Sequence, residues 1–361
     1  MNKIKVAEKY IYDKLGKTVK LPIYSPDATR GYVRGLTSAD LAYCGVESIV
    51  VNTFHLIYFP GGDILKRVGG IQGYYNWPGL VISDSGGFQM LSMIYQDSGF
   101  GTISNSGIVI KRKVGKKIDN FKFTPQKCIE MQFKLGADII YCIDDCPRDA
   151  NNREDVKNSV DRTIKWAKLC KETFDRLVTQ TGRKALLFAV IQGGSFKNER
   201  VRCADSLKEI GFDGYGFGGW PLDKDNNLDT EIFGLTAELM EEGKPKFALG
   251  VGNPQAIVEG YKMGYNMFDC VLPTRDGRHG KLFMMREDLD STNILLKSSV
   301  ADQIYIRDES FTRNFNEMID GYSFAFVNHL FRRSEPLGMR LASMYNLKQY
   351  MKLIGFLREL A

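Results

Sequence analysis

Short apolar, β-branched runs alternate with stretches of helical periodicity along most of the chain. The apolar runs are SIVVNT, LVISDSGG, DIIYCIDDC, LLFAVIQGG, GYGFGG, FALGVG and MFDCVLPTR. Helical periodicity lies between them, for example in PQKCIEMQFKLG, at 156–177 and at 230–240. Strands that are buried on both faces and alternate with helices predict a parallel sheet. With one more strand expected near the N-terminus, we predict an α/β fold of the (β/α)8 TIM-barrel type.

Each apolar run ends in a polar residue or in glycine. The C-terminal ends of all strands converge on one face of a (β/α)8 barrel, so these residues would line a single pocket. An open doubly wound sheet is the alternative, but it would gather polar strand ends mainly near a topological switch point. The residues in question are Asn52, Asp84, Asp144, Gln192, Gly218 with Gly219, Gly250 with Gly252, and Asp269.

The stretch from 291 to 361 differs in character from the rest. It opens with a polar segment and ends in helical patterns such as FAFVNHLFRR and LKQYMKLIGFLREL. We therefore expect two parts. Residues 1–290 would form the catalytic barrel with an N-terminal extension, and residues 291–361 an appended helical subdomain.

Composition agrees with a globular enzyme that remains in the cytoplasm. The 361 residues are 43% hydrophobic and 25% charged, and the seven cysteines are an odd number without paired spacing. Such cysteines favour a reducing compartment over a disulfide framework. The N-terminus has neither a signal-peptide nor a transit-peptide pattern, and no apolar run approaches the length of a membrane span. We therefore expect a cytoplasmic protein that is not associated with a membrane.

Positive charge is modest overall but clustered. The net charge is +6, and basic residues gather in KRKVGKK at 111–117, around Arg275, Arg278 and Lys281, and at Arg332 with Arg333. Such clusters suit a polyanionic partner such as a nucleic acid. An ordinary solvated basic surface explains them equally well.

Three of the strand-end residues are aspartates, namely Asp84, Asp144 and Asp269. Several carboxylates in a pocket without a metal-binding pattern indicate nucleophilic and acid–base chemistry at a glycosidic centre. An aspartate at a strand end can instead cap the following helix, and the convergence expected of a barrel is what favours the catalytic interpretation. A glycoside hydrolase is a competing interpretation, which the basic clusters do not support. Next to Asp269, TRDGRHGK is expected to be an open loop whose arginines clamp phosphates.

With these residues in place, the sequence resembles the tRNA-guanine transglycosylases, and their bacterial branch most closely. The resemblance runs from about Pro26 through Phe283, and is weaker beyond. The segments that carry it occur in the family's order: RGLTSADL, NTFHL, PGG, SDSGGFQ, IDDC, IQGG, GFGG, LGVGNP and FDCVLPTRDGRHG.

The resemblance implies a base exchange in which guanine of a nucleic acid is replaced by a 7-deazaguanine. Asp269 would be the covalent nucleophile at the ribose, and Asp84 the general acid and base. The remaining roles are also implied by the resemblance. Asp144, Gln192, Gly219, Phe88, Cys146 and Trp220 would surround the base, while Asn52, Arg275 and Arg278 would contact the ribose and the nucleic acid.

The sequence departs from the family at its C-terminal zinc site, normally three cysteines and one histidine. The flanking matches place those ligands at Asn314, Asn316, Ile319 and Tyr345, and no cysteine follows Cys270. None of these four can form a thiolate-rich tetrahedral site. We therefore expect no cofactor, no structural zinc, and a subdomain held by apolar packing.

A second departure follows GFGG, where the chain reads WPLDK from Trp220 to Lys224. The family usually has a small-residue loop that ends in Gly-Glu. We expect Trp220 and Pro221 to narrow the pocket, and Lys224 to replace the acid unless Asp223 compensates. A nitrile-bearing deazaguanine would then fit better than queuine.

The expected partners are a tRNA anticodon loop, with the wobble guanine as target, and the free base. Double-stranded DNA is the alternative substrate, because related enzymes insert 7-deazaguanines into DNA. A non-catalytic tRNA-binding subunit is a third interpretation, disfavoured by the intact aspartates. The resemblance also implies a homodimer.

Overall fold

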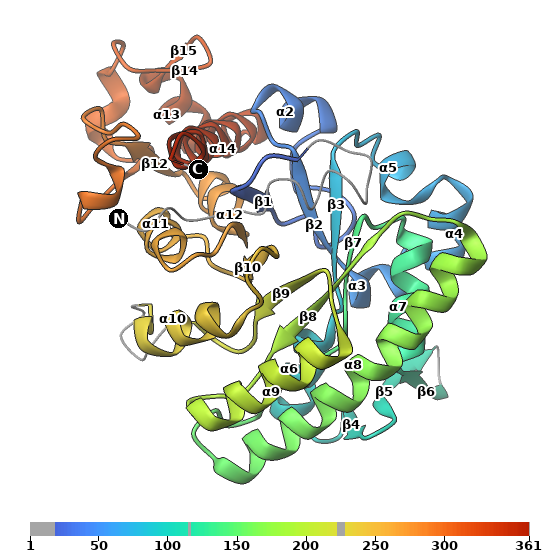
Figure 1. Ribbon diagram of the computed structural model, residues 1–361. Coiled ribbons are helices and arrows are strands. Elements are labelled where there is room, and N and C mark those ends of the chain that lie inside the picture. Colours follow the sequence, from blue (N-terminus) through green and yellow to red (C-terminus); the bar gives the residue numbers. More distant parts are fainter. Residues whose placement is uncertain (1–18, 115–116, 222–227, 361) are drawn as a thin grey trace.

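A ring of eight parallel strands forms the centre of the computed structural model, which describes residues 19–114, 117–221 and 228–360 (Figure 1). Hydrogen bonds join these strands in the order β1-β11-β10-β9-β8-β7-β3-β2, so each lies beside its neighbour in the chain. The strands are β1 (Ile23–Pro26), β2 (Ser48–Asn52), β3 (Leu80–Asp84), β7 (Ile139–Tyr141), β8 (Leu186–Ile191), β9 (Gly214–Phe217), β10 (Lys246–Ala248) and β11 (Met267–Cys270).

The ring closes between its two end strands, β1 and β2. A parallel bridge pairs Asp27 with Val50, and the Ala28 backbone N–H donates to the Val50 carbonyl at 2.7 Å. All other neighbouring strands pair in parallel register. The prediction of a (β/α)8 barrel is thus confirmed.

Helices follow the strands and surround the ring (Figure 1). Their ends carry the expected signals: in α7, for example, the Thr124 hydroxyl accepts from the Lys127 N–H at the start, and Gly136 ends the helix in a left-handed conformation. The helices of the barrel region are α2 (Ser38–Tyr43), α3 (Thr53–Tyr58), α4 (Gly62–Arg67), α5 (Gly70–Tyr74), α6 (Gly87–Gln96), α7 (Pro125–Leu135), α8 (Arg153–Thr181), α9 (Lys197–Ile210), α10 (Thr230–Leu239), α11 (Pro254–Lys262) and α12 (Leu272–Arg278).

A three-stranded antiparallel sheet interrupts the barrel between α6 and α7, and the sequence did not predict it. It consists of β4 (Gly101–Ser104), β5 (Gly107–Val114) and β6 (Lys117–Phe123). The basic segment 111–117 lies on its two longer strands, and residues 115 and 116 are outside the described residues.

Inward-facing side chains fill the lower part of the barrel. Along each strand they recur at every second residue, as expected where alternate side chains face one side of a sheet. They form one buried apolar cluster, which includes Ile23, Val50, Leu80, Ile82, Ile139, Tyr141, Leu186, Phe188, Val190, Phe247 and Met267. Because this cluster fills the interior of the barrel, the space for a ligand lies beyond it, at the C-terminal ends of the strands.

The C-terminal region packs against the barrel through one long helix, α14 (Pro336–Arg358). Tyr350 donates its hydroxyl to the Gly252 carbonyl at 2.6 Å, and Arg340 pairs with Asp40 at 2.6 Å. The other elements of this region are β12 (Lys281–Met285), the 3-10 helix η1 (Ile294–Leu296), β13 (Ala301–Tyr305), the 3-10 helix η2 (Glu309–Arg313), β14 (Met318–Ile319), β15 (Tyr322–Ser323) and α13 (Phe324–Arg332). The division between 1–290 and 291–361 stays a prediction.

Apolar and turn-forming residues stand at the four positions that match the family's zinc ligands. Ile319 is buried in a cluster with α13 and the start of α14, and the Tyr345 ring lies edge-on to Phe324 at a centroid distance of 6.3 Å. The Asn314 side-chain oxygen accepts from the backbone N–H groups of Asn316 and Glu317 at 3.3 and 3.1 Å. Among the described residues, no group of three or more His, Cys, Asp or Glu side chains is placed to hold a metal ion.

Candidate active site

A cavity of about 290 Å³ opens at the C-terminal ends of the strands, and each strand of the ring, or the segment directly after it, contributes to its wall. It brings together most of the side chains that the sequence predicted for the site. These are Asn52, Asp84, Phe88, Asp144, Gln192, Gly219, Trp220 and Asp269.

Asp84 is held by Asn52 from the neighbouring strand. The two residues are in register at the ends of β3 and β2, and Asn52 Nδ2 donates to Asp84 Oδ2 at 2.7 Å. The amide cannot turn freely, because its oxygen caps α3 by accepting from the backbone N–H of Phe54 at 3.0 Å. The Gly86 N–H also donates to Asp84, at 3.3 Å. Asp84 is therefore fixed in orientation with its carboxyl at the cavity wall.

Asp144 faces Gln192 across the cavity wall between β7 and β8. Gln192 Nε2 donates to Asp144 Oδ2 at 2.6 Å. The amide oxygen of Gln192 is buried and has no hydrogen-bond partner among the described residues. A buried acceptor without a partner is costly, so this atom is suited to a ligand that supplies a donor.

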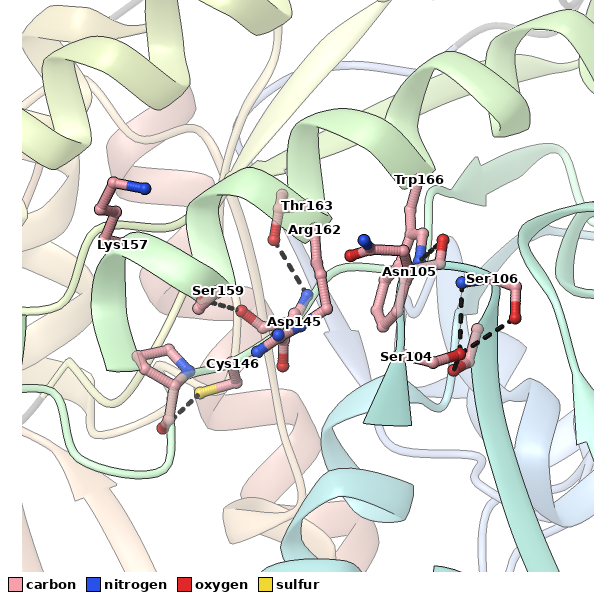
Figure 2. A network of polar contacts seen from close by, with 12 residues as sticks. Ser104, Asn105, Ser106, Asp145, Cys146, Lys157, Ser159, Arg162, Thr163 and Trp166 are labelled. Carbon is pink, nitrogen blue, oxygen red and sulfur yellow. Dashed lines mark hydrogen bonds and ion pairs between the residues drawn. The ribbon is translucent and has the colours of Figure 1, made fainter. Parts of the chain in front are cut away.

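The neighbouring Asp145 anchors this strand end to α8, as Figure 2 shows. Its carboxylate pairs with Arg162, its backbone N–H donates to the Thr163 hydroxyl at 3.0 Å, and its carbonyl accepts from Ser159. Because Asp145 is buried and directed toward the helix, Asp144 is left to face the cavity.

Asp269 is the penultimate residue of β11 and accepts a hydrogen bond from the Gly250 backbone N–H at 2.8 Å. It is the one predicted nucleophile, and it enters the cavity between the strand ends of β10 and β1. Carboxylates that accept only one such bond retain free lone pairs for attack.

Burial makes the three carboxyls unusually hard to ionise. Burial raises the pKa of Asp144 to about 7 and that of Asp269 to about 7, and the charge of Asp84 adds to both effects. Burial also raises the pKa of Asp84, against the lowering effect of its bonds from Gly86 and Asn52. Carboxyls poised near neutral pH are suited to proton transfer and nucleophilic attack.

A buried arginine, Arg200 on α9, holds the glycine turns of the site. Its guanidinium donates to the carbonyls of Gly194, Ile191 and Gly218 at 2.8, 3.3 and 3.2 Å. Gly218 is required here, because a Cβ at this position would lie 2.7 Å from the Gln192 side chain. Arg200 thereby fixes both the loop that carries Gln192 and the loop that carries Gly219.

Two aromatic side chains lie exposed at the cavity. Phe88, in the first turn of α6, is 46% exposed, and Trp220, after β9, is 68% exposed. Exposed aromatic faces beside a pocket are available for stacking on a base. Asp223 and Lys224, predicted to tune this loop, lie outside the described residues.

Three predicted site residues are not in the cavity wall. Cys146 is half-buried next to Pro147, and burial raises the pKa of its thiol to about 12. Arg275 and Arg278 lie on α12, beyond Asp269, and the Nη1 atom of Arg278 is buried without a hydrogen-bond partner among the described residues.

The expectation of an open loop at TRDGRHGK was wrong in its first part, since residues through Arg278 are helical. Asp276 is the carboxylate partner that sequence reasoning missed. It pairs with Arg275 at 3.2 Å and lies 3.7 Å from the Lys281 ammonium. The segment therefore begins as a short charged helix, and the aspartate that pairs with Arg275 lies within the motif itself.

Sequence reasoning also missed Asp27, which lines the cavity next to the bridge that closes the barrel. The signal was present, because IYSPD repeats the pattern of an apolar run that ends in a carboxylate. Pro26 ends the short strand β1 and interrupts the apolar run directly before Asp27. The pattern of an apolar run ending in a carboxylate was therefore not recognised.

A (β/α)8 barrel with a carboxylate-lined pocket at the C-terminal ends of its strands has the architecture of the TIM-barrel enzymes. Comparison with known proteins identifies the family. The profile described as "Queuine tRNA-ribosyltransferase" matches residues 11–360. Curated relatives with that same name include one from Thermoanaerobacter sp. (strain X514), 34% identical over 94% of this chain and 86% of its own. Those from Ruminiclostridium cellulolyticum and Actinobacillus pleuropneumoniae are 34% and 33% identical over 94% of this chain and 86% and 85% of their own.

The chain therefore belongs to the queuine tRNA-ribosyltransferase family, as the sequence motifs predicted. Ile319 and Tyr345, which the sequence match assigns to zinc-ligand positions of the family, lie in apolar packing, and the absence of zinc stays a prediction. In the part of the chain that the structure describes, no helix is long and apolar enough to cross a membrane.

Proposed function

We propose that this protein is a base-exchange transglycosylase. It replaces guanine in a nucleic acid with a 7-deazaguanine, at the wobble position of tRNA, through a covalent Asp269–ribosyl intermediate. The observation that carries the proposal is the joint presence of Asp84, Asp144 and Asp269 around one cavity, each with a different hydrogen-bond partner. Membership of the family supports the same chemistry.

Asp269 performs the first step. One carboxylate oxygen forms a bond to C1′ of the target nucleotide, and the C1′–N9 bond breaks with its electron pair leaving on guanine. The Gly250 N–H, 2.8 Å from the other side of this carboxylate, holds the group in position during the attack. The product is an ester between Asp269 and the nucleic acid.

Asp84 moves the proton that balances this step. Burial raises its pKa, which favours the protonated form, and this form donates its proton to the departing guanine. In the second step the incoming base returns a proton from N9 to Asp84. Its N9 then forms the new bond to C1′, and the Asp269 ester bond breaks.

Asp144 and Gln192 recognise the base. A guanine-like edge presents N1–H and an exocyclic amine, both donors, and Asp144 presents carboxylate oxygens at the cavity wall. Donors from the base stabilise the ionised form of Asp144, whose pKa in the free protein is about 7. The second Nε2 hydrogen of Gln192 and the Gly219 backbone N–H donate to the base carbonyl, and Phe88 stacks on the ring.

The incoming base is a small 7-deazaguanine. Trp220 and Pro221 follow Gly219 in the cavity wall, and their bulk reduces the room for a large 7-substituent. A nitrile group needs less room and carries no charge.

Incorporation of radiolabelled guanine tests this function. The protein is incubated with the label and either unmodified tRNA or double-stranded DNA. Label in tRNA is the expected result. Label in DNA alone would move the protein to the DNA-modifying branch, and label in neither would favour a non-catalytic tRNA-binding subunit. Size-exclusion chromatography with light scattering, with and without tRNA, tests the expected homodimer.

A further inference from the structure

A fourth carboxylate, Asp27, belongs to the same inward-facing layer as the site described above. Along β1 the inward positions are Ile23, Ser25 and then Asp27, each two residues apart. Ser25 is in register with Asp269 on β11, and Asp27 bridges to Val50 on β2. Asp27 therefore enters the cavity between the strand of the nucleophile and the strand of Asn52.

The place of Asp27 in the ring separates it from the base. In the closed order of eight strands, β1 lies opposite β8, the strand that leads to Gln192. A base that reaches from C1′ toward Asp144 and Gln192 leaves its sugar on the side of β11, β1 and β2. Asp27 therefore faces the sugar in a complex in which Asp269 attacks C1′. This step rests on the proposed function.

The chemistry of Asp27 suits a hydroxyl donor. Its side chain accepts hydrogen bonds from Thr29, and a carboxylate has about four lone-pair sites, so acceptor capacity remains. Neighbouring strands lie about 4.8 Å apart, which places a group on β1 within reach of the atoms next to C1′. The hydroxyl bonded to the carbon next to C1′ is the ribose 2′-OH.

We propose that Asp27 accepts a hydrogen bond from the 2′-OH of the target nucleotide and thereby makes the enzyme selective for RNA over DNA. The 2′-OH is the group that distinguishes the two nucleic acids at a given site. Burial raises the pKa of Asp27, while the hydrogen bonds from Thr29 and the positive charge of Arg278 act in the opposite direction and favour its acceptor form. A 2′-deoxynucleotide leaves this half-buried carboxylate without that donor, which costs binding energy in the transition state.

Two RNA hairpins test the proposal. They carry the same sequence and differ only by a 2′-hydrogen in place of the 2′-OH at the target guanosine. The ratio of guanine-exchange rates, ribo over deoxy, is measured for the wild type, Asp27→Ala, Asp27→Asn and the control Asp205→Asn. Asp205 is an exposed carboxylate on α9 that pairs with Lys208.

The ratio of ribo to deoxy exchange rates isolates the contact between Asp27 and the 2′-OH from other effects of the substitution. Removing Asp27 also removes a charge that raises the pKa of Asp84 and of Asp269, but this change acts on both hairpins alike. Intrinsic differences in reactivity between the two sugars cancel when variants are compared.

We expect Asp27→Ala to lower the ratio roughly ten- to hundredfold, the effect of one hydrogen bond to a charged group. Asp27→Asn keeps one acceptor oxygen and should lower the ratio less, while Asp205→Asn leaves it unchanged. An equal ratio in the wild type and both Asp27 variants would overturn the inference and leave the proposed function intact. No exchange by the wild type on either hairpin would overturn the proposed function, and this inference with it.

Discussion

The side chain of Asn52 caps helix α3 with its oxygen and donates its nitrogen to Asp84 at 2.7 Å. One residue thus links the start of a helix to the general acid of the proposed reaction. The cap decides which way the amide points, because the oxygen is already bound to backbone N–H groups.

Replacing Asn52 by Ala should therefore slow base exchange about tenfold or more and raise the pKa of Asp84 further, since the Asn52 hydrogen bond lowers it. The measurement is kcat as a function of pH. The basic limb should move to higher pH in the variant. A variant with wild-type kcat and an unshifted limb would contradict the role of this pair.

The raised pKa values of Asp144 and Asp269 predict that the contribution of these carboxyls to the stability of the fold falls as pH rises. Asp144 and Asp269 have a pKa of about 7 in the folded protein, well above the ordinary value of 3.8. The folded state holds their protons more tightly than the unfolded state between about pH 4 and pH 7. Their stabilising contribution is complete below pH 4 and is lost as pH rises through 7.

Asp269→Asn should accordingly melt at a higher temperature than the wild type at pH 8, by at least about 2 °C, and the difference should vanish near pH 4. Differential scanning calorimetry across this range measures it. Asp63→Asn, at an exposed ion pair with Lys134, is the matched control. Equal melting temperatures of Asp269→Asn and wild type at pH 8 would argue against the raised pKa.

The barrel and most of its site were predictable because both rest on a local signal. Each strand is a short apolar run, and each functional side chain stands at its end, as Asp84 and Asp269 do. Closure of the barrel then brings these ends together without any further information.

The residues that escaped prediction act through contacts made only in three dimensions. Arg200 lies in the first turn of α9, and nothing in the helix pattern indicates that it would hold three carbonyls of two distant loops. The small sheet β4–β6 has mixed apolar and basic strands, which resemble a charged surface segment when considered alone. Asp276 was overlooked as a partner because its motif was expected to be an open loop.

The C-terminal region should be stable without zinc, because Ile319 and Tyr345 take part in apolar packing at the ligand positions. Treatment with a strong chelator should leave the melting temperature unchanged. Ile319→Ala should destabilise the protein by about 2–5 kcal/mol, the usual cost of removing a buried aliphatic side chain. Leu296→Ala, at a position 77% exposed, is the control. A melting temperature that falls on chelation would contradict this account.

Trp220 should determine which base enters the site. Replacing this exposed indole by alanine removes a stacking surface and widens the cavity mouth. We expect the KM for guanine to rise roughly tenfold, in line with about 1–3 kcal/mol for base–aromatic stacking. Bases with large 7-substituents should gain relative to guanine. Competition assays with both bases measure this, and an unchanged preference would exclude Trp220 from base selection.

Covalent trapping tests the central claim, that Asp269 is the nucleophile. The protein is incubated with an RNA hairpin that carries the target guanosine, denatured, and resolved on a gel that separates free protein from protein–RNA adduct. The wild type should form an adduct that disappears when free base is added, and Asp269→Asn should form none while it still binds the hairpin. An adduct that persists in Asp269→Asn would contradict the assignment of the nucleophile.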